Sequence, residues 1–193
     1  GGTLLGVDRL VRAVHQTVSI QIRTGVYQRG NEFEVQFLVV AGHFHSGFEA
    51  DFAVPISRGQ GGKIENQTLI QAKGKTYTVR ELLKTEKWTA AFDGGQFMTY
   101  YLCPTDYHRV HSPVDGRVVW SSHIPGELWP VNAWSVNAIH NLFAVNERVA
   151  LVIDTPKGKI ALIMVAATNV GNMTMTFDPS ITTTKRPSNR KVT

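Results

Sequence analysis

Apolar residues near the start of the chain recur at alternating steps of three and four positions. The series is Leu4, Val7, Val11, Val14 and Val18, and this spacing is typical of one face of an amphipathic helix. The opposite face is not rich in Lys or Arg, which favours a helix packed on a core over a helix lying on a membrane surface. The pattern therefore predicts an N-terminal amphipathic helix over residues 4–22.

The pattern changes after residue 33, where short apolar runs alternate with turn residues. Residues 33–54 are rich in Phe and Val and are typical of strands broken by glycines. The glycine-rich stretch 58–62 lacks the Lys-Ser or Lys-Thr pair of a phosphate-binding loop, so it predicts a turn. Later strands are expected at Gln96–Leu102, Gly116–Ser122, Arg148–Asp154 and Lys159–Ala166, and helical stretches near Thr78–Lys84 and Val136–Leu142.

This order of elements restricts the fold class. Strands and helices do not alternate regularly, which argues against a doubly wound parallel sheet. The sequence predicts a β-dominated α+β domain of antiparallel sheets or a barrel-like arrangement, with one or two short helices. Cys103 is the single cysteine, which excludes an intramolecular disulfide and a Cys-rich metal site. No apolar run approaches the roughly 20 residues of a membrane-spanning helix.

The net charge of +5 comes mostly from the end of the chain. Residues 179–193 contain Lys185, Arg186, Arg190 and Lys191 and no acidic residue, so they carry +4 and the remainder carries +1. A nearly neutral body gives no reason to expect a nucleic-acid partner. We interpret residues 179–193 as a basic connector.

Potential chemistry is concentrated in the stretch YYLCPTDYHRVH at residues 100–111. Asp106, His108, Arg109 and His111 lie within six positions, and alternation along a strand would place several of these side chains on one face. Imidazoles suit proton transfer near neutral pH, and a neighbouring Asp or Arg can orient them or hold an anionic group. A polar surface loop explains the same residues equally well when spacing alone is considered.

The wider context of this stretch resembles the phosphatidylserine decarboxylase family. Phe92-Asp93-Gly94 is followed by YLCPTDYHRVHSPVDG at 101–116, which is similar to the central motif of that family. Residues 62–83 resemble the segment upstream of that motif. The blocks HIPGELWPVN (123–132), NLFAVNER (141–148) and VAATNVG (165–171) follow in the family's order. The resemblance covers about residues 62–178.

The resemblance implies a self-processing proenzyme. In this family a Ser that follows Gly attacks the preceding carbonyl, and the downstream fragment, the α-chain, is left with a pyruvoyl group. That ketone is the electron sink when phosphatidylserine loses carbon dioxide to give phosphatidylethanolamine. By position in the motif, His111 matches the base of the Asp–His pair that activates the Ser. His108 matches the histidine placed for substrate handling or proton delivery.

Two features depart from the family pattern. The Asp of the Asp–His pair has no counterpart, because Pro55-Ile56-Ser57-Arg58-Gly59 lacks an acid, Asp51 lies before the proline, and Asp115 follows His111. The 193 residues also contain no Gly-Ser pair. We therefore expect residues 1–61 to be a divergent N-terminal region, 62–178 the decarboxylase-like domain, and 179–193 a connector to a processing segment with Gly-Ser-Thr. The chain would then be a truncated β-chain portion, inactive alone, with the pyruvoyl Ser beyond its end.

The resemblance also implies partners and a location. We expect a phospholipid substrate at a membrane surface and an α-chain partner, with peripheral membrane attachment, at the cytoplasmic face of the inner membrane if the source is bacterial. The sequence leaves a homo-oligomer open, and an inactive paralogue is a further alternative. The alternative of another class is a non-catalytic or cupin-like metal-binding β-domain, because His43, His45 and Glu49 follow an H-x-H-x3-E pattern. The framing glycines of that pattern are absent, so we expect no metal site.

Overall fold

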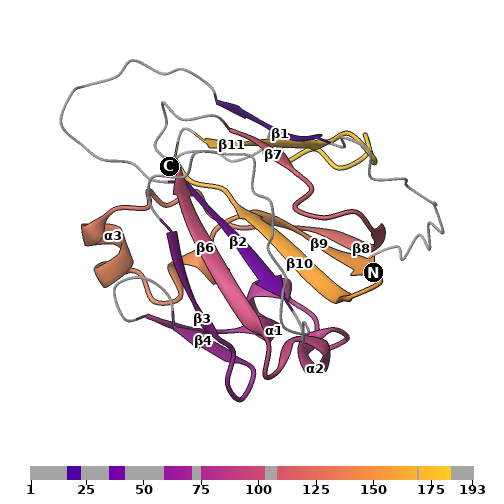
Figure 1. Ribbon diagram of the computed structural model, residues 1–193. Helices are drawn as coiled ribbons and strands as arrows, with labels where there is room; N and C mark the ends of the chain where they lie inside the picture. Colours follow the sequence, from indigo (N-terminus) through magenta and orange to yellow (C-terminus); the bar gives the residue numbers. More distant parts are fainter. Residues whose placement is uncertain are drawn as a thin grey trace.

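The computed structural model describes residues 17–22, 35–41, 59–70, 75–102, 108–168 and 170–183. These residues form eleven strands and four short helices (Figure 1). The strands are β1 (Thr17–Ile22), β2 (Val35–Ala41), β3 (Gly59–Lys63), β4 (Thr68–Ile70), β5 (Thr76–Thr78), β6 (Gln96–Leu102), β7 (Arg109–His111), β8 (Arg117–Ile124), β9 (Arg148–Thr155), β10 (Gly158–Val165) and β11 (Val170–Met175). The helices are α1 (Val79–Leu83), α2 (Thr89–Phe92), α3 (Ala133–Ala138) and α4 (Leu142–Val145).

The strands pair into three antiparallel sheets. The largest has the order β3-β6-β2-β10-β9-β8, a second has the order β11-β1-β7, and β4 and β5 form a two-stranded ribbon. Every strand pair in the three sheets is antiparallel, and none of the sheets closes into a barrel within the described part of the chain. The predicted β-dominated fold with antiparallel sheets and short helices is therefore confirmed, in an open form.

Both faces of the six-stranded sheet are covered. In β9, Val149 and Leu151 belong to one core cluster, whereas Ala150 and Val152 belong to the other. The first cluster includes β7 and β11 residues of the three-stranded sheet, and the second includes residues of the helices and of the β4–β5 ribbon. Strands buried on both faces read as continuous apolar runs, which explains the sequence of β9 and β10. Figure 1 shows the three-stranded sheet above the larger sheet.

Local sequence signals explain where α1 begins and ends. The Thr78 hydroxyl accepts a hydrogen bond from the Glu81 N–H, and the Glu81 carboxylate accepts one from the Thr78 N–H at 2.9 Å. This capping box satisfies two backbone donors at the helix start. The helix ends at Lys84, which has φ of 56° and donates its N–H to the Arg80 carbonyl. The predicted helical stretch near Thr78–Lys84 is thus confirmed.

Arg148 connects the sheet to two helices. Its side chain is fully buried and donates hydrogen bonds to the carbonyls of Glu81 and Leu82, at the end of α1, at 2.8 and 2.7 Å. It also donates to the carbonyls of Ala144 and Asn146, at the end of α4, at 2.7 and 2.9 Å. Helix ends present unpaired carbonyls and partial negative charge, both of which suit a guanidinium. Burial lowers the pKa of Arg148 to about 10, so it stays charged at neutral pH.

Three sequence-based expectations need correction. Residues 17–22 form strand β1 and no helix, because Val18, Ile20 and Ile22 also alternate with polar residues and pair with β11. The rest of the expected helix, residues 4–16, lies outside the described residues. The stretch Val136–Leu142 does not form one helix, since α3 ends at Ala138 and α4 begins at Leu142.

The glycine-rich stretch is an edge strand, which corrects the predicted turn. Residues 59–63 form β3 and pair with β6. A Cβ atom on Gly62 would lie 2.9 Å from the Phe97 ring, so the glycine allows the two strands to approach around that side chain. Gly62 therefore allows β3 to lie close to β6, and it does not mark a reversal of the chain.

We expect Arg148→Met to destabilise the fold by at least about 3 kcal/mol, because it leaves four carbonyls, two of them in buried hydrogen bonds, without this donor. Arg148→Lys should recover only part of this loss, since an ammonium group cannot reach both helix ends. The measurement is urea unfolding followed by circular dichroism. Arg117→Met is the matched control, because Arg117 is exposed at the start of β8. Equal unfolding midpoints for Arg148→Met and Arg117→Met would contradict this role of Arg148.

The raised pKa values of two buried tyrosines lead us to expect a loss of folding stability at alkaline pH. Burial raises the pKa of Tyr77 and of Tyr100 to about 12, whereas an unfolded Tyr ionises near pH 10. Stability from these groups is therefore fully present below about pH 10 and is lost as the pH rises towards about 12. Urea midpoints from pH 8 to 11.5 should fall in that window, and phenolate absorbance should appear late. A Tyr77→Phe/Tyr100→Phe variant should show a flatter profile, and an unchanged slope would refute the assignment.

Candidate active site

The histidine-bearing motif spans the end of β6 and the whole of β7. Residues 100–102 complete β6, residues 103–107 lie outside the described part of the chain, and His108 directly precedes β7. Strand β7 pairs with β1, so that His111 is opposite Thr17 and Arg109 is opposite Ser19. The motif therefore joins the edge of the three-stranded sheet to the end of the six-stranded sheet. Asp106 lies outside the described residues.

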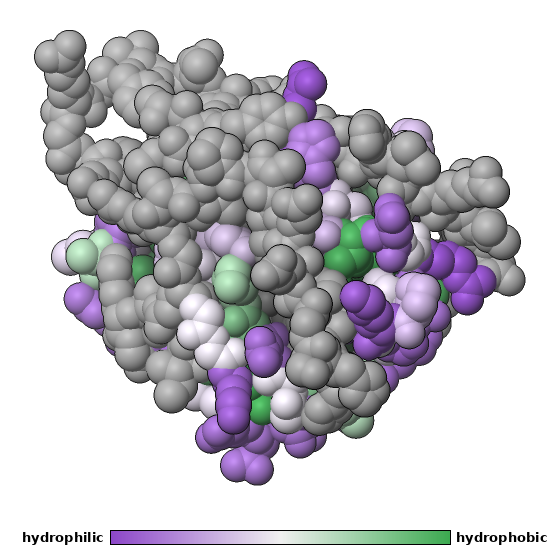
Figure 2. Space-filling view, viewed as in Figure 1, coloured by the Kyte–Doolittle hydropathy of each residue, from purple (hydrophilic) through white to green (hydrophobic). Residues whose placement is uncertain are grey.

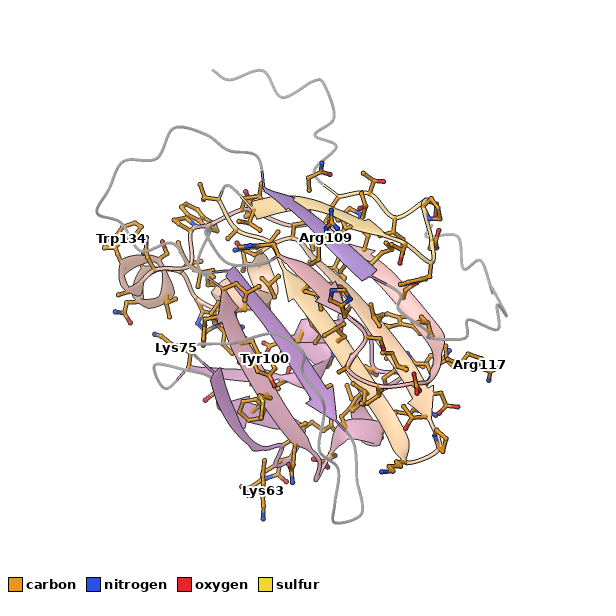
Figure 3. The ribbon with its side chains drawn as sticks, turned by 45° about the horizontal axis from the view of Figure 1, so that its top comes forward. Lys63, Lys75, Tyr100, Arg109, Arg117 and Trp134 are labelled. Atoms are coloured by element: carbon orange, nitrogen blue, oxygen red, sulfur yellow. The ribbon has the colours of Figure 1, made fainter. Side chains whose placement is uncertain are left out.

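The two histidines have different surroundings. His108 is 5% exposed, and Val110, which alternates with it, is buried in the core between the two larger sheets. Arg109 and His111 are exposed and share the other face of β7 (Figure 3 labels Arg109). Alternation thus places Arg109 and His111 on one face, as predicted, but it separates them from His108, which is three positions before His111. Arg109 and His111 are therefore accessible to a reacting partner, whereas His108 is shielded from water.

The other candidates from the sequence fall in different places. Asp115 is exposed in the turn after β7. Asp51 and the proposed metal ligands His43, His45 and Glu49 lie outside the described residues. Within the ranges that the structure describes, no group of three or more His, Cys, Asp and Glu side chains could hold a metal ion.

A pair that the sequence analysis missed joins β8 to the start of β9. His123 Nε2 lies 2.7 Å from Glu147 Oε1, with the Glu147 side chain 8% exposed and the His123 side chain 31% exposed. Antiparallel pairing of Ile124 with Arg148 brings these two positions together. The two residues are 24 positions apart, so their contact depends on the register of β8 against β9, which the sequence pattern alone does not give.

Two motif blocks, PGELW at 125–129 and NER at 146–148, pack tightly against each other at the end of the sheet that holds the His123–Glu147 pair. The side chain of Asn146 accepts a hydrogen bond from the Trp129 N–H and donates to the carbonyls of Trp129 and Ala166, each at 2.9 Å. The Glu127 N–H donates to the Val145 carbonyl. A Cβ atom on Gly126 would lie 2.3 Å from that carbonyl oxygen. The contacts described for these two blocks therefore fix the geometry of the loop.

Register shows that this junction and the histidine segment leave the sheet at the same end. One row of successive Cα partners crosses strands β6, β2, β10, β9 and β8. Its members are Tyr101, Gln36, Val165, Arg148 and Ile124. Beyond this row, β6 continues towards His108, β8 continues into the loop that contains Trp129, and β9 is preceded by Asn146. The loop, the His123–Glu147 pair and the candidate catalytic segment therefore share one end of the fold.

No helix in the described part of the chain is long and apolar enough to cross a bilayer.

Comparison with known proteins shows which family the motif blocks belong to. The family model "Phosphatidylserine decarboxylase" matches residues 58–187. The chain is similar to the phosphatidylserine decarboxylase proenzyme of Anaeromyxobacter sp. (strain K), with 46% identity over 126 residues, which are 65% of this chain and 45% of that protein. The proenzyme of Polaromonas sp. is 44% identical over 128 residues, covering 65% and 45%, and that of Myxococcus xanthus is 45% identical over 118 residues, covering 61% and 42%.

The chain thus spans less than half the length of these curated relatives. The matched region contains all the described strands from β3 to β11 and includes both histidines of the motif. The match extends over more than half of the chain, and this chain therefore belongs to the phosphatidylserine decarboxylase family.

Proposed function

We propose that this chain supplies the histidine-bearing part of a phosphatidylserine decarboxylase proenzyme. In this proposal the completed protein removes carbon dioxide from phosphatidylserine to give phosphatidylethanolamine. The observation that supports it most directly is the placement of an exposed His111 and a buried His108 around one short strand, within the segment that matches the family. The relatives are named proenzymes, which supports a partner α-chain cut from the same precursor.

His111 has the exposure that self-processing requires. A base for the Ser hydroxyl must be reachable by a segment from elsewhere in the protein, and His111 lies on the outward face of β7. There its imidazole can take the hydroxyl proton as the Ser oxygen attacks the preceding carbonyl carbon, and can return that proton to the leaving amide nitrogen. Arg109 shares this face and offers a guanidinium fork that matches the carboxylate or the phosphate of the substrate headgroup.

His108 has the surroundings expected of a proton donor in decarboxylation. After carbon dioxide leaves, the product carbon must receive a proton, and a donor held away from bulk water can direct that transfer. His108 is 5% exposed, and it directly precedes β7, two positions before the buried Val110. The burial of His108 therefore supports a role in the second half of the reaction, after processing.

The prosthetic group in this proposal is a pyruvoyl group. The 193 residues contain no Gly-Ser pair, and we propose that its Ser belongs to another part of the precursor. The polar groups of the motif suit it, because a ketone that reacts with an aminophospholipid needs a proton donor and a cation for the anionic headgroup. When bound, the group supplies an electron sink for the bond to the departing carbon dioxide. The corresponding location is peripheral, at a membrane surface, and in a bacterium the cytoplasmic face of the inner membrane.

The proposal predicts different failures for the two histidines in the extended protein. His111→Ala should leave one unprocessed chain on a denaturing gel, because the Ser lacks its base. His108→Ala should still be cut into two fragments but should release carbon dioxide from phosphatidylserine at least about 100-fold more slowly, through kcat, since general acid catalysis contributes about 10² to 10⁴.

The matched control is His140→Ala, because His140 is exposed and lies outside the motif. This variant should be processed like the parent. Normal processing of His111→Ala would remove His111 from the proposed role. Absence of carbon dioxide release from a processed parent protein would refute the activity itself.

A further inference from the structure

Exposed large hydrophobic residues are concentrated in one segment of the protein. Where side chains are described, Met98, Trp129, Trp134 and Val145 are the exposed members of this class, and three of them lie between residues 128 and 146. That segment contains no Asp, Glu, Lys or Arg. Single exposed apolar residues are ordinary, but a charge-free segment with several of them points to an interaction surface.

Helix α3 presents the centre of this surface. Ser135 and Val136 are its buried residues, so the helix turns the rest of its length outward. Trp134 is 69% exposed, and it lies on the side of α3 that faces away from the sheets (Figure 3). Ala133 and Ala138 are exposed beside it. We define the tryptophan face as Trp129, Ala133, Trp134, Ala138 and Val145.

The tryptophan face is held rigidly. The Asn132 side chain accepts a hydrogen bond from the Ser135 N–H at 2.8 Å and caps α3. Asn146 fixes the Trp129 backbone, and Arg148 binds the Ala144 carbonyl, next to Val145. A surface fixed by its backbone loses little conformational entropy when a partner covers it.

This face lies at the candidate active-site end of the fold. The loop that carries Trp129 leaves the sheet at the row where β6 continues towards His108. Figures 1 and 3 both show α3 beside the end of β6. In Figure 2, most of the strongly hydrophilic side chains instead gather at the lower end and on the right of the molecule.

The composition of the tryptophan face favours a lipid partner over a protein partner, and the small exposed area of its two largest side chains agrees with this. Taking about 250 Å² for a whole Trp side chain, the two tryptophans, 69% and 38% exposed, offer on the order of 250 Å². A stable protein–protein contact buries about 800 Å² on each partner. Trp residues prefer the boundary between lipid headgroups and acyl chains, and a shallow contact of this kind needs only a few aromatic anchors.

We propose that the tryptophan face is the surface by which the protein rests on a lipid bilayer. Contact through this face would hold the histidine end of the fold at the level of the headgroups, where a phospholipid substrate is reached. The inference rests on the proposed function for its biological purpose, but the contact itself needs no substrate. It can therefore be tested on the 193-residue chain with vesicles that contain no phosphatidylserine.

The experiment measures partitioning of this chain onto phosphatidylcholine vesicles by flotation. The parent chain should bind, with little dependence on salt concentration, because the contact is apolar. Trp129→Ala/Trp134→Ala should lower the partition coefficient by about tenfold or more, and Trp134→Phe should retain most of the binding. Met98→Ala is the matched control, since Met98 is 41% exposed near the other end of β6. Circular dichroism checks that each variant folds.

Several results would overturn the inference. They are absence of binding by the parent chain, equal binding by the double tryptophan variant, and an equal loss in Met98→Ala. A concentration-dependent dimer that the double variant abolishes would assign the face to a second protein copy instead. Vesicle binding without decarboxylation in the extended protein would retain this surface and refute the enzyme proposal, whereas decarboxylation with unchanged binding of the double variant would do the reverse.

Discussion

The buried guanidinium of Arg148 is the interaction on which the helical side of the domain depends. Helices α1 and α4 have five and four residues, and helices this short are not stable alone in water. Their terminal carbonyls converge on one cation at the start of β9, although α1 lies more than 60 positions earlier in the chain. Four carbonyls at these helix ends lack their guanidinium donor until the sheet has formed. The helices, the sheet and the loop that carries Trp129 therefore form one cooperative unit.

The strands that could be predicted from the sequence are those whose pattern has one interpretation. Strands β6, β8, β9 and β10 carry β-branched and aromatic runs between turn residues, and the structure has them within two positions of the expected bounds. The region of β1 carried two periodicities at once, and pairing with β7 and β11 decided in favour of the strand. In β3 the glycines suggested a turn, whereas the Phe97 ring on the neighbouring strand leaves no room for a Cβ atom at Gly62.

The candidate site shows the same limit. The sequence located His108 and His111 through the motif, but it could not tell that one is buried and the other exposed, because that depends on which face of β7 meets the core. Glu147 and Arg148 are neighbours in the sequence, but their printed partners lie on different elements. Successive residues of a strand point to opposite faces, so Glu147 meets His123 while Arg148 reaches the helices.

Asn146 illustrates how chemistry can constrain a position more tightly than size does. Its amide nitrogen donates to two carbonyls, and its oxygen accepts one N–H, so all three contacts depend on which end of the amide carries hydrogens. An aspartate has nearly the same shape but would direct a carboxylate oxygen at two carbonyl oxygens within a buried site. A comparison of relatives by residue volume alone would rate that exchange as mild. At this position the arrangement of hydrogen-bond donors and acceptors, and not the shape of the side chain, decides which residue can be accepted.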